Sequence, residues 1–376
     1  MRNITERILH LVTVVLFISF VVGCTGGMEP DVVPGPDEAP NETPGMVDVC
    51  FYVGEHGSVP TKIINPATTG ESQINRWALL LVKSGENTVY RSYTSTTSSG
   101  INVIIPAGTY TAYAVVNYPS SGTGAFTPVD GMSVSELTGH VSDLSDNAIG
   151  SLVMFGSKSI SLVVGDNPTQ TISVVRLVAK LGIKNISVDL SGKDFGSNIQ
   201  FEISRIFVSN IYLTTMYGSD YSVAQMQSST NWHNRMGYSS SLSYDTLLCQ
   251  NFYSSLVWNN SGWGQQKNAD SYFYCYQNQV LKGSDSTSST WSKRCSRIVI
   301  EAVVSGGNWS GVYYYPITVA STQKGILRNN TYVADLVTIT NLGSTDPEGV
   351  NPGACSVTWA TDTDDWSGPY LINENS

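Results

Sequence analysis

Charged side chains are scarce in this 376-residue chain, and basic ones are scarcer than acidic ones. Lysine and arginine together number 20, against 30 for aspartate and glutamate, which gives a formal net charge of −10. A protein that binds nucleic acid needs a basic patch to neutralise phosphates, and the sequence contains no basic stripe. The composition therefore excludes nucleic acid as a partner.

Motifs that carry catalysis or bind metals are missing as well. The sequence has no G-x-S-x-G elbow, HExxH pair, phosphate-binding glycine loop or dinucleotide fingerprint. Histidine occurs four times, and the cysteines form no C-x-x-C pair of the kind that binds zinc. We therefore predict a protein that is not an enzyme and has no catalytic residue, metal or cofactor.

The sequence has only one long hydrophobic run, from Ile8 to Val22, and Arg2 and Arg7 precede it. A membrane-spanning helix takes roughly 20 apolar residues, so this shorter run is typical of a secretory signal peptide. It ends in VVGC, which resembles a bacterial lipobox. That resemblance implies cleavage after residues 1–23 and a diacylglycerol on Cys24, which would carry palmitate or similar chains. The alternative is an ordinary signal peptide with an incidental cysteine.

The next segment, 24–45, is rich in proline, glycine and acidic residues, so we expect a disordered tether. About 330 residues remain, enough for two ordinary domains of an exported protein. An odd number of cysteines remains after Cys24, so they cannot all pair. A Cys249–Cys275 disulfide and free, half-buried thiols both stay open.

The remaining chain is made of short stretches with the period of a strand. In MVDVCFYV, the side chains of Val47, Val49, Phe51 and Val53 point one way, as in a strand with one buried face. Similar stretches recur between glycine and proline turns, and one short helix is expected near Ser133. The pattern restarts at about Thr171. We predict an all-β fold with minor α structure, in two tandem β-sandwich domains over 46–170 and 171–376.

An aromatic-rich region between residues 232 and 276 supports a competing function. Exposed tryptophan faces amid serine, asparagine and glutamine commonly bind sugars, so Trp258 and Trp263 are candidate glycan contacts of a tip or non-polymerising surface lipoprotein. The alternative is that these aromatic residues belong to strands or pack a long loop.

Segments spread over nearly the whole mature chain together resemble the fimbrillins, the type V pilus subunits of Bacteroidetes bacteria. They are GESQINRWALLLV, PAGTYTAYAVVNYP, SVVRLVAKLGI, YFYCYQN, RIVIEAVV with YYYPI, and RNNTYVADLVTITNLGSTDPE. Each alone is a strand with a turn, and their order and spacing carry the resemblance. It implies transthyretin-like sandwich domains in an adhesive pilus subunit (fimbria), which is exported to the cell surface as an outer-membrane lipoprotein.

The resemblance also implies a mechanism of assembly by donor-strand exchange. A processing protease releases the first strand, here Met46 to Val53 with Val47, Val49, Phe51 and Val53 as its plugs. The C-terminal segment of a neighbouring subunit then fills the groove. Here the donor would lie in Ala354 to Trp366, where Cys355, Val357 and Trp359 alternate in the same manner. The alternative is that both segments are permanent strands of their own domains. The implied partners are other pilus subunits, joined head-to-tail, the protease, and a receptor on a host or bacterial surface.

The sequence departs from the family at the processing site. Family members are typically cut after an arginine in the loop that follows the first strand, but the loop at 54–73 contains no arginine. Lys62 is its one basic residue, and Arg76 stands at the start of the next strand. Both are candidate processing points, and the position of the subunit as stalk, tip or anchor stays open.

Overall fold

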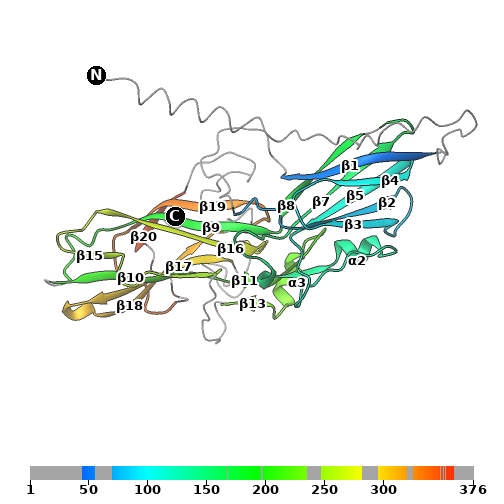
Figure 1. Cartoon of the computed structure of the whole chain (residues 1–376). Helices are drawn as coiled ribbons and strands as arrows, with labels where there is room; N and C mark the ends of the chain where they lie inside the picture. Colours follow the sequence, from blue (N-terminus) through cyan, green and yellow to red (C-terminus); the bar gives the residue numbers. More distant parts are fainter. Residues whose placement is uncertain are drawn as a thin grey trace, which may run out of the picture. The chain divides into compact units, whose positions relative to one another are not determined.

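The computed structural model describes residues 45–55, 70–166, 168–195, 198–234, 247–281, 295–319, 325–347, 349, 351 and 353–359. The chain from Gly45 onward forms one compact unit, and Figure 1 shows that strands dominate it. The predicted all-β fold with minor α structure is confirmed. Among the described residues, no helix is long and apolar enough to cross a membrane.

A seven-stranded sheet forms the first part of this unit, in the order β3-β2-β5-β7-β8-β1-β4. Its strands are β1 (Met46–Glu55), β2 (Trp77–Lys83), β3 (Arg91–Ser95), β4 (Ile101–Pro106), β5 (Gly108–Val116), β7 (Met154–Leu162) and β8 (Thr169–Arg176). β7 and β8 pair only through Met154 and Phe155 with Arg176 and Val175. The sheet turns at this short contact, so that β8, β1 and β4 share one apolar core with β2, β5 and β7. The result is a two-layered sandwich.

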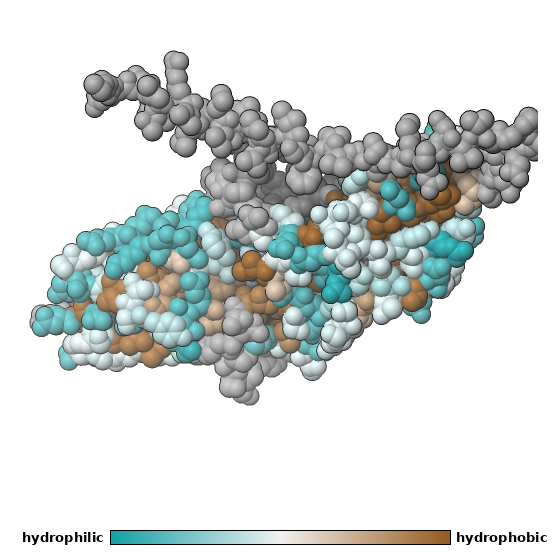
Figure 2. Space-filling view, in the orientation of Figure 1, coloured by the Kyte–Doolittle hydropathy of each residue, from teal (hydrophilic) through white to brown (hydrophobic). Residues whose placement is uncertain are grey.

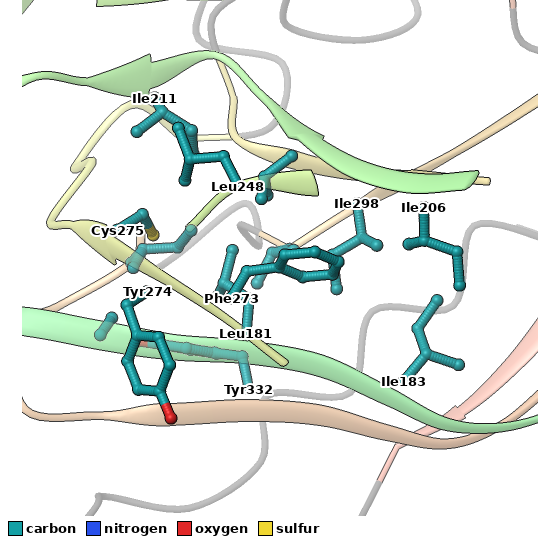
Figure 3. Close-up of a cluster of buried hydrophobic side chains, with 14 of the residues drawn as sticks. Leu181, Ile183, Ile206, Ile211, Leu248, Phe273, Tyr274, Cys275, Ile298 and Tyr332 are labelled. Atoms are coloured by element: carbon teal, nitrogen blue, oxygen red, sulfur yellow. The ribbon is translucent and has the colours of Figure 1, made fainter. Parts of the chain in front are cut away.

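Two further large sheets form most of the rest of the unit. One has the order β16-β9-β19-β20 and the other β14-β10-β17-β18, with β15 also on β10. Their strands are β9 (Val178–Val188), β10 (Gln200–Ser209), β14 (Cys249–Asn251), β15 (Val257–Asn259), β16 (Gln266–Tyr276), β17 (Arg297–Ser305), β18 (Gly311–Thr318), β19 (Thr331–Ile339) and β20 (Cys355–Trp359). Figure 3 shows Leu181 and Ile183 from one sheet facing Ile206 and Ile298 from the other. Alternating apolar side chains of both sheets therefore form a second core.

Short elements connect these sheets. They are α2 (Val134–Thr138), β6 (Val141–Asp143), η2 (Leu144–Asp146), β11 (Ile211–Tyr212), β12 (Thr214–Met216), α3 (Val223–Ser228), β13 (Trp232–His233) and η3 (Gly307–Trp309). Two pairs of these strands, β11 with β13 and β12 with β6, form two small sheets. The predicted helix near Ser133 is α2, and the Ser133 side chain accepts a hydrogen bond from the backbone N–H of Glu136. This capping box satisfies two backbone donors that the helix itself leaves unpaired.

The stretch 171–190 contains two consecutive strands that belong to different sheets. β8 pairs with β1 and β7, whereas β9 pairs with β16 and β19. Only Leu177 separates them, so the chain changes sheet at that residue. The division into domains at 46–170 and 171–376 stays a prediction.

Candidate assembly site

β1 contributes its inward side chains to the core of the first sandwich. Val47, Val49 and Phe51 are at most 1% exposed, whereas Asp48 between them is exposed. Val53, the fourth predicted plug, is half-buried and packs against the same core. The strand and its alternation are therefore as predicted, and the release of the strand stays a prediction.

β1 joins two strands that do not pair with each other. Its first half is antiparallel to β4, from Met46 opposite Pro106 to Phe51 opposite Ile101. Its second half is parallel to β8, from Cys50 opposite Thr169 to Glu55 opposite Val174. Figure 1 shows β1 in blue beside both strands. Within the described residues β4 has no other strand neighbour, so β1 is what ties β4 to the sheet.

Removing β1 would expose the core beneath it. The apolar side chains that share this core with β1 come from β2, β4, β5, β7 and β8 (Leu79, Leu81, Val103, Ile105, Ala112, Ala114, Ile160, Ile172 and Val174 among them). β4 and β8 would then each present an unpaired backbone edge, which is a template for another strand. Figure 2 shows hydrophobic surface already present in the region where Figure 1 draws β1 and β4, and Ile104 on β4 is 65% exposed.

The predicted donor residues lie on β20, an edge strand of their own sheet. β20 is antiparallel to β19, from Cys355 opposite Ile339 to Trp359 opposite Ala334. Trp359 is buried in the second core, and Cys355 and Val357 are half-buried against it. The rest of the predicted donor, 360–366, lies outside the described residues, as do Lys62 and Cys24.

Asn117 holds the chain just before β2. Its side-chain amide donates to the backbone oxygens of Gln73 (2.7 Å) and Leu152 (3.0 Å), and its side-chain oxygen accepts from the backbone N–H of Asn75 (2.8 Å). Its own N–H donates to the backbone oxygen of Arg76 at 2.9 Å. Asn117 has a φ of 54°, a left-handed conformation that asparagine adopts more readily than most residues. Three of the four bonds bring the segment before β2 alongside the end of β5, and the fourth reaches Leu152 just before β7.

Arg76, the second candidate processing point, is half-buried where this segment enters β2. Its guanidinium lies 5.4 Å from the centre of the Tyr118 ring, and Trp77, the residue that follows it, is fully buried. A cut at this point would fall at the margin of a packed strand.

Glu71, also in this segment, is the centre of a buried polar cluster. Its carboxylate is 2.7 Å from the ammonium of Lys180, and the two side chains are 1% and 7% exposed. The hydroxyl of Tyr274 donates to the same carboxylate oxygen. Burial, together with the hydrogen bond to Glu71 and its negative charge, raises the pKa of Tyr274, so the phenol stays protonated and can donate.

Arg176 fixes the backbone of the same residue. Its Nε donates to the backbone oxygen of Glu71 at 3.0 Å, and it also contacts Ser72 and Asn329. The ammonium of Lys180 lies 4.6 Å from the centre of the Tyr272 ring, a distance at which the ring quadrupole attracts a cation. Both charges of the Glu71–Lys180 pair are therefore enclosed by partners, as a buried ion pair requires.

This cluster was missed in the sequence, although four of the segments that carry the fimbrillin resemblance meet in it. Glu71 lies in GES, Arg176 and Lys180 in VVRLVAK, Tyr274 in YFYCY and Asn329 in RNN. Isolated charges in otherwise apolar stretches were the available signal. Arg176 and Tyr274 lie 105 and 203 positions from Glu71 in the sequence, and no local sequence pattern indicates that they meet it.

The aromatic region does not offer the tryptophan surface that glycan binding was expected to use. Trp258 is 1% exposed, its indole N–H donates to the backbone oxygen of Gln265 at 2.7 Å, and its ring packs edge-on against Phe201. Trp263 is half-buried against the second core. The structure thus places Trp258 in the core, and the sugar-binding alternative receives no support from it.

Cys249 and Cys275 are not joined to each other, so the Cys249–Cys275 disulfide is not formed. Cys275 is fully buried on β16, and this burial raises its thiol pKa to about 12. A thiol of such high pKa forms little thiolate and is chemically inert.

Comparison by sequence finds no match among protein-family models or curated proteins. The fold is that of a class of all-β proteins built from stacked sheets, and solved structures share it. One is a candidate cell adhesion protein from Bacteroides eggerthii, with a TM-score of 0.61, 18% identity and coverage of 86% of this chain and 98% of that one. A fimbrilin from Porphyromonas gingivalis gives a TM-score of 0.54 at 13% identity, with 83% and 96% coverage.

A second candidate cell adhesion protein, from Parabacteroides distasonis, gives a TM-score of 0.53 at 14% identity, over 87% and 98% of the two chains. The fimbrillin-type fold predicted from the sequence is therefore confirmed.

Proposed function

We propose that this chain is a subunit of a cell-surface pilus that supports adhesion, is exported as a lipoprotein through Cys24, and assembles by donor-strand exchange. The observation that carries the proposal is the position of β1. It supplies three buried side chains to a core that other strands complete, and it hydrogen-bonds to two strands that do not pair with each other. The fold shared with fimbrilins and cell adhesion proteins supports the same role.

Release of β1 requires a cut in the chain that follows it. Lys62 and Arg76 are the candidate points, and a cut at either would free the end of β1 that pairs with β8. Burying Val47, Val49 and Phe51 stabilises the sandwich by about 1.5–3 kcal/mol per side chain. The empty groove therefore favours a replacement strand of similar pattern, because that strand would recover both the burial and the backbone hydrogen bonds.

β20 has the pattern that such a replacement needs. When β20 is aligned with β1 in the same chain direction, Cys355, Val357 and Trp359 take the places of Val47, Val49 and Phe51. The aromatic residue then stands at the same end of both strands. Among the described residues β20 has one strand neighbour, β19, so leaving breaks one ladder and withdraws Trp359 from the second core. Groove and donor lie on different parts of the chain, so the contact is head-to-tail and continues into a filament.

The N-terminus of the protein on the cell surface tests this function. Filaments are sheared from cells and sequenced by Edman degradation, and we expect a start between residue 56 and residue 77. An acylated chain that retains β1 and stays in the outer membrane would contradict polymerisation and identify an anchor. Other pilus subunits, the protease and a surface receptor are the partners to be sought in the same material.

A further inference from the structure

The segment from Gly70 to Arg76 links the loop that follows β1 to the buried strand β2, and Glu71 is its one buried side chain. Glu71 contacts Lys180 on β9, Tyr274 on β16 and Arg176 at the end of β8. None of these residues belongs to β1. The contacts therefore remain intact when β1 leaves, provided that Glu71 itself stays with the rest of the protein.

The two candidate processing points differ in what happens to Glu71. A cut N-terminal to Glu71 leaves it attached to β2, with its ion pair and hydrogen bonds unchanged. A cut after Arg76 places Glu71 on the fragment that carries β1, so release of that fragment would also remove the carboxylate from Lys180. An ammonium that is 7% exposed would then be left without its counter-ion, which is strongly destabilising.

The bond after Arg76 is also poorly presented to a protease. The backbone oxygen of Arg76 accepts the N–H of Asn117, and Trp77 on the other side of the bond is fully buried. Cleavage there requires the segment to open locally first, and Glu71 opposes that opening.

We propose that Glu71 is a retention anchor: it holds Gly70–Arg76 on the protein when β1 is released and thereby restricts processing to bonds N-terminal to Glu71. This inference rests on the proposed release of β1, and it removes Arg76 from the candidate processing points. It also gives the mature subunit a defined start, because the chain that precedes β2 stays bound across β8, β9 and β16.

Limited trypsin digestion of the purified full chain tests the anchor, since trypsin cleaves after lysine and arginine. The N-terminus of the folded product is read by mass spectrometry and Edman degradation. In the wild type, we expect the product that contains β2 to begin before Glu71 and the Arg76–Trp77 bond to stay intact, whatever cuts occur further along the chain. In Glu71→Gln, cleavage after Arg76 should become about 100-fold faster. Removing one charge of a buried pair destabilises the closed position of Gly70–Arg76, so the locally opened state that trypsin cleaves becomes about 100-fold more populated.

Two further variants guard against misfolding and non-specific effects. Glu86→Gln changes an exposed carboxylate in the turn after β2, and it should leave the Arg76–Trp77 bond as resistant as in the wild type. Tyr274→Phe keeps the ion pair and removes one hydrogen bond, so its rate of cleavage after Arg76 should lie between those of the wild type and Glu71→Gln. If Glu71→Gln does not fold, this variant tests the anchor in its place.

The outcomes separate the anchor from the proposed function. A wild-type product that is folded, lacks β1 and begins at Trp77 would overturn the anchor and leave strand release standing. A fragment carrying β1 that stays bound in the presence of excess peptide 354–366 would instead overturn strand release, whatever the state of the Arg76 bond.

Discussion

Single residues in this protein decide where the chain before β2 lies, and Asn117 is the clearest case. Its side chain makes three hydrogen bonds to backbone groups on either side of it, and it is 4% exposed. The sequence places Asn117 at the end of a strand, and the resemblance includes it, but neither indicates which backbone groups it would bind. Such bonds depend on the meeting of three segments, which is a property of the folded chain.

The contribution of Asn117 can be measured by substitution. Asn117→Ala should lower the free energy of unfolding by about 2–4 kcal/mol, because it leaves buried backbone groups unpaired. Asn117→Gly should lower it by about 1 kcal/mol less, since glycine adopts the left-handed conformation without the steric cost that alanine meets. Urea unfolding followed by circular dichroism gives both values. Equal stability of Asn117→Ala and the wild type would show that these bonds contribute nothing.

At the scale of the strand, the sequence predicted β1 well because its apolar side chains alternate, although Cys50 on the other face is buried as well. Val47, Val49 and Phe51 alternate with Asp48 and Cys50, and this period of two is visible without any tertiary information. The neighbours of β1 could not be predicted in the same way. Its parallel pairing with β8 joins residues more than a hundred positions apart, and β8 itself reads as continuous with β9.

The release of β1 makes a strand-level prediction about stability. Phe51→Ala should destabilise the unprocessed chain by about 3–5 kcal/mol, as is usual when a buried phenylalanine is truncated. The same substitution should leave the melting temperature of processed, donor-filled subunits unchanged, because β1 is then absent. Differential scanning calorimetry of both forms provides the comparison.

Phe201→Ala is the matched control for this measurement. Phe201 is fully buried in the second core, which processing does not touch, so this substitution should destabilise both forms alike. If Phe51→Ala lowers the melting temperature of the processed form as much as that of the precursor, β1 is a permanent strand.

For the molecule as a whole, the head-to-tail contact predicts how defective subunits combine. A chain lacking 354–376 can open its groove but has no donor, so after processing it should stay monomeric. A chain that cannot be processed has a donor but keeps its groove filled, so it should stay monomeric as well. Mixed together, the two can form one contact and no more, because the resulting dimer has neither a free donor nor an open groove.

The mixture should therefore give a dimer that survives on unboiled gels and nothing larger, whereas processed wild-type chains should give a ladder. Light scattering and native mass spectrometry determine the size and composition of the product. The processed truncation also needs to be folded on its own, because Trp359 packs in the second core, and circular dichroism decides this. Longer chains in the mixture would contradict a single donor and a single groove. Absence of the dimer from folded components would place the donor outside 354–376.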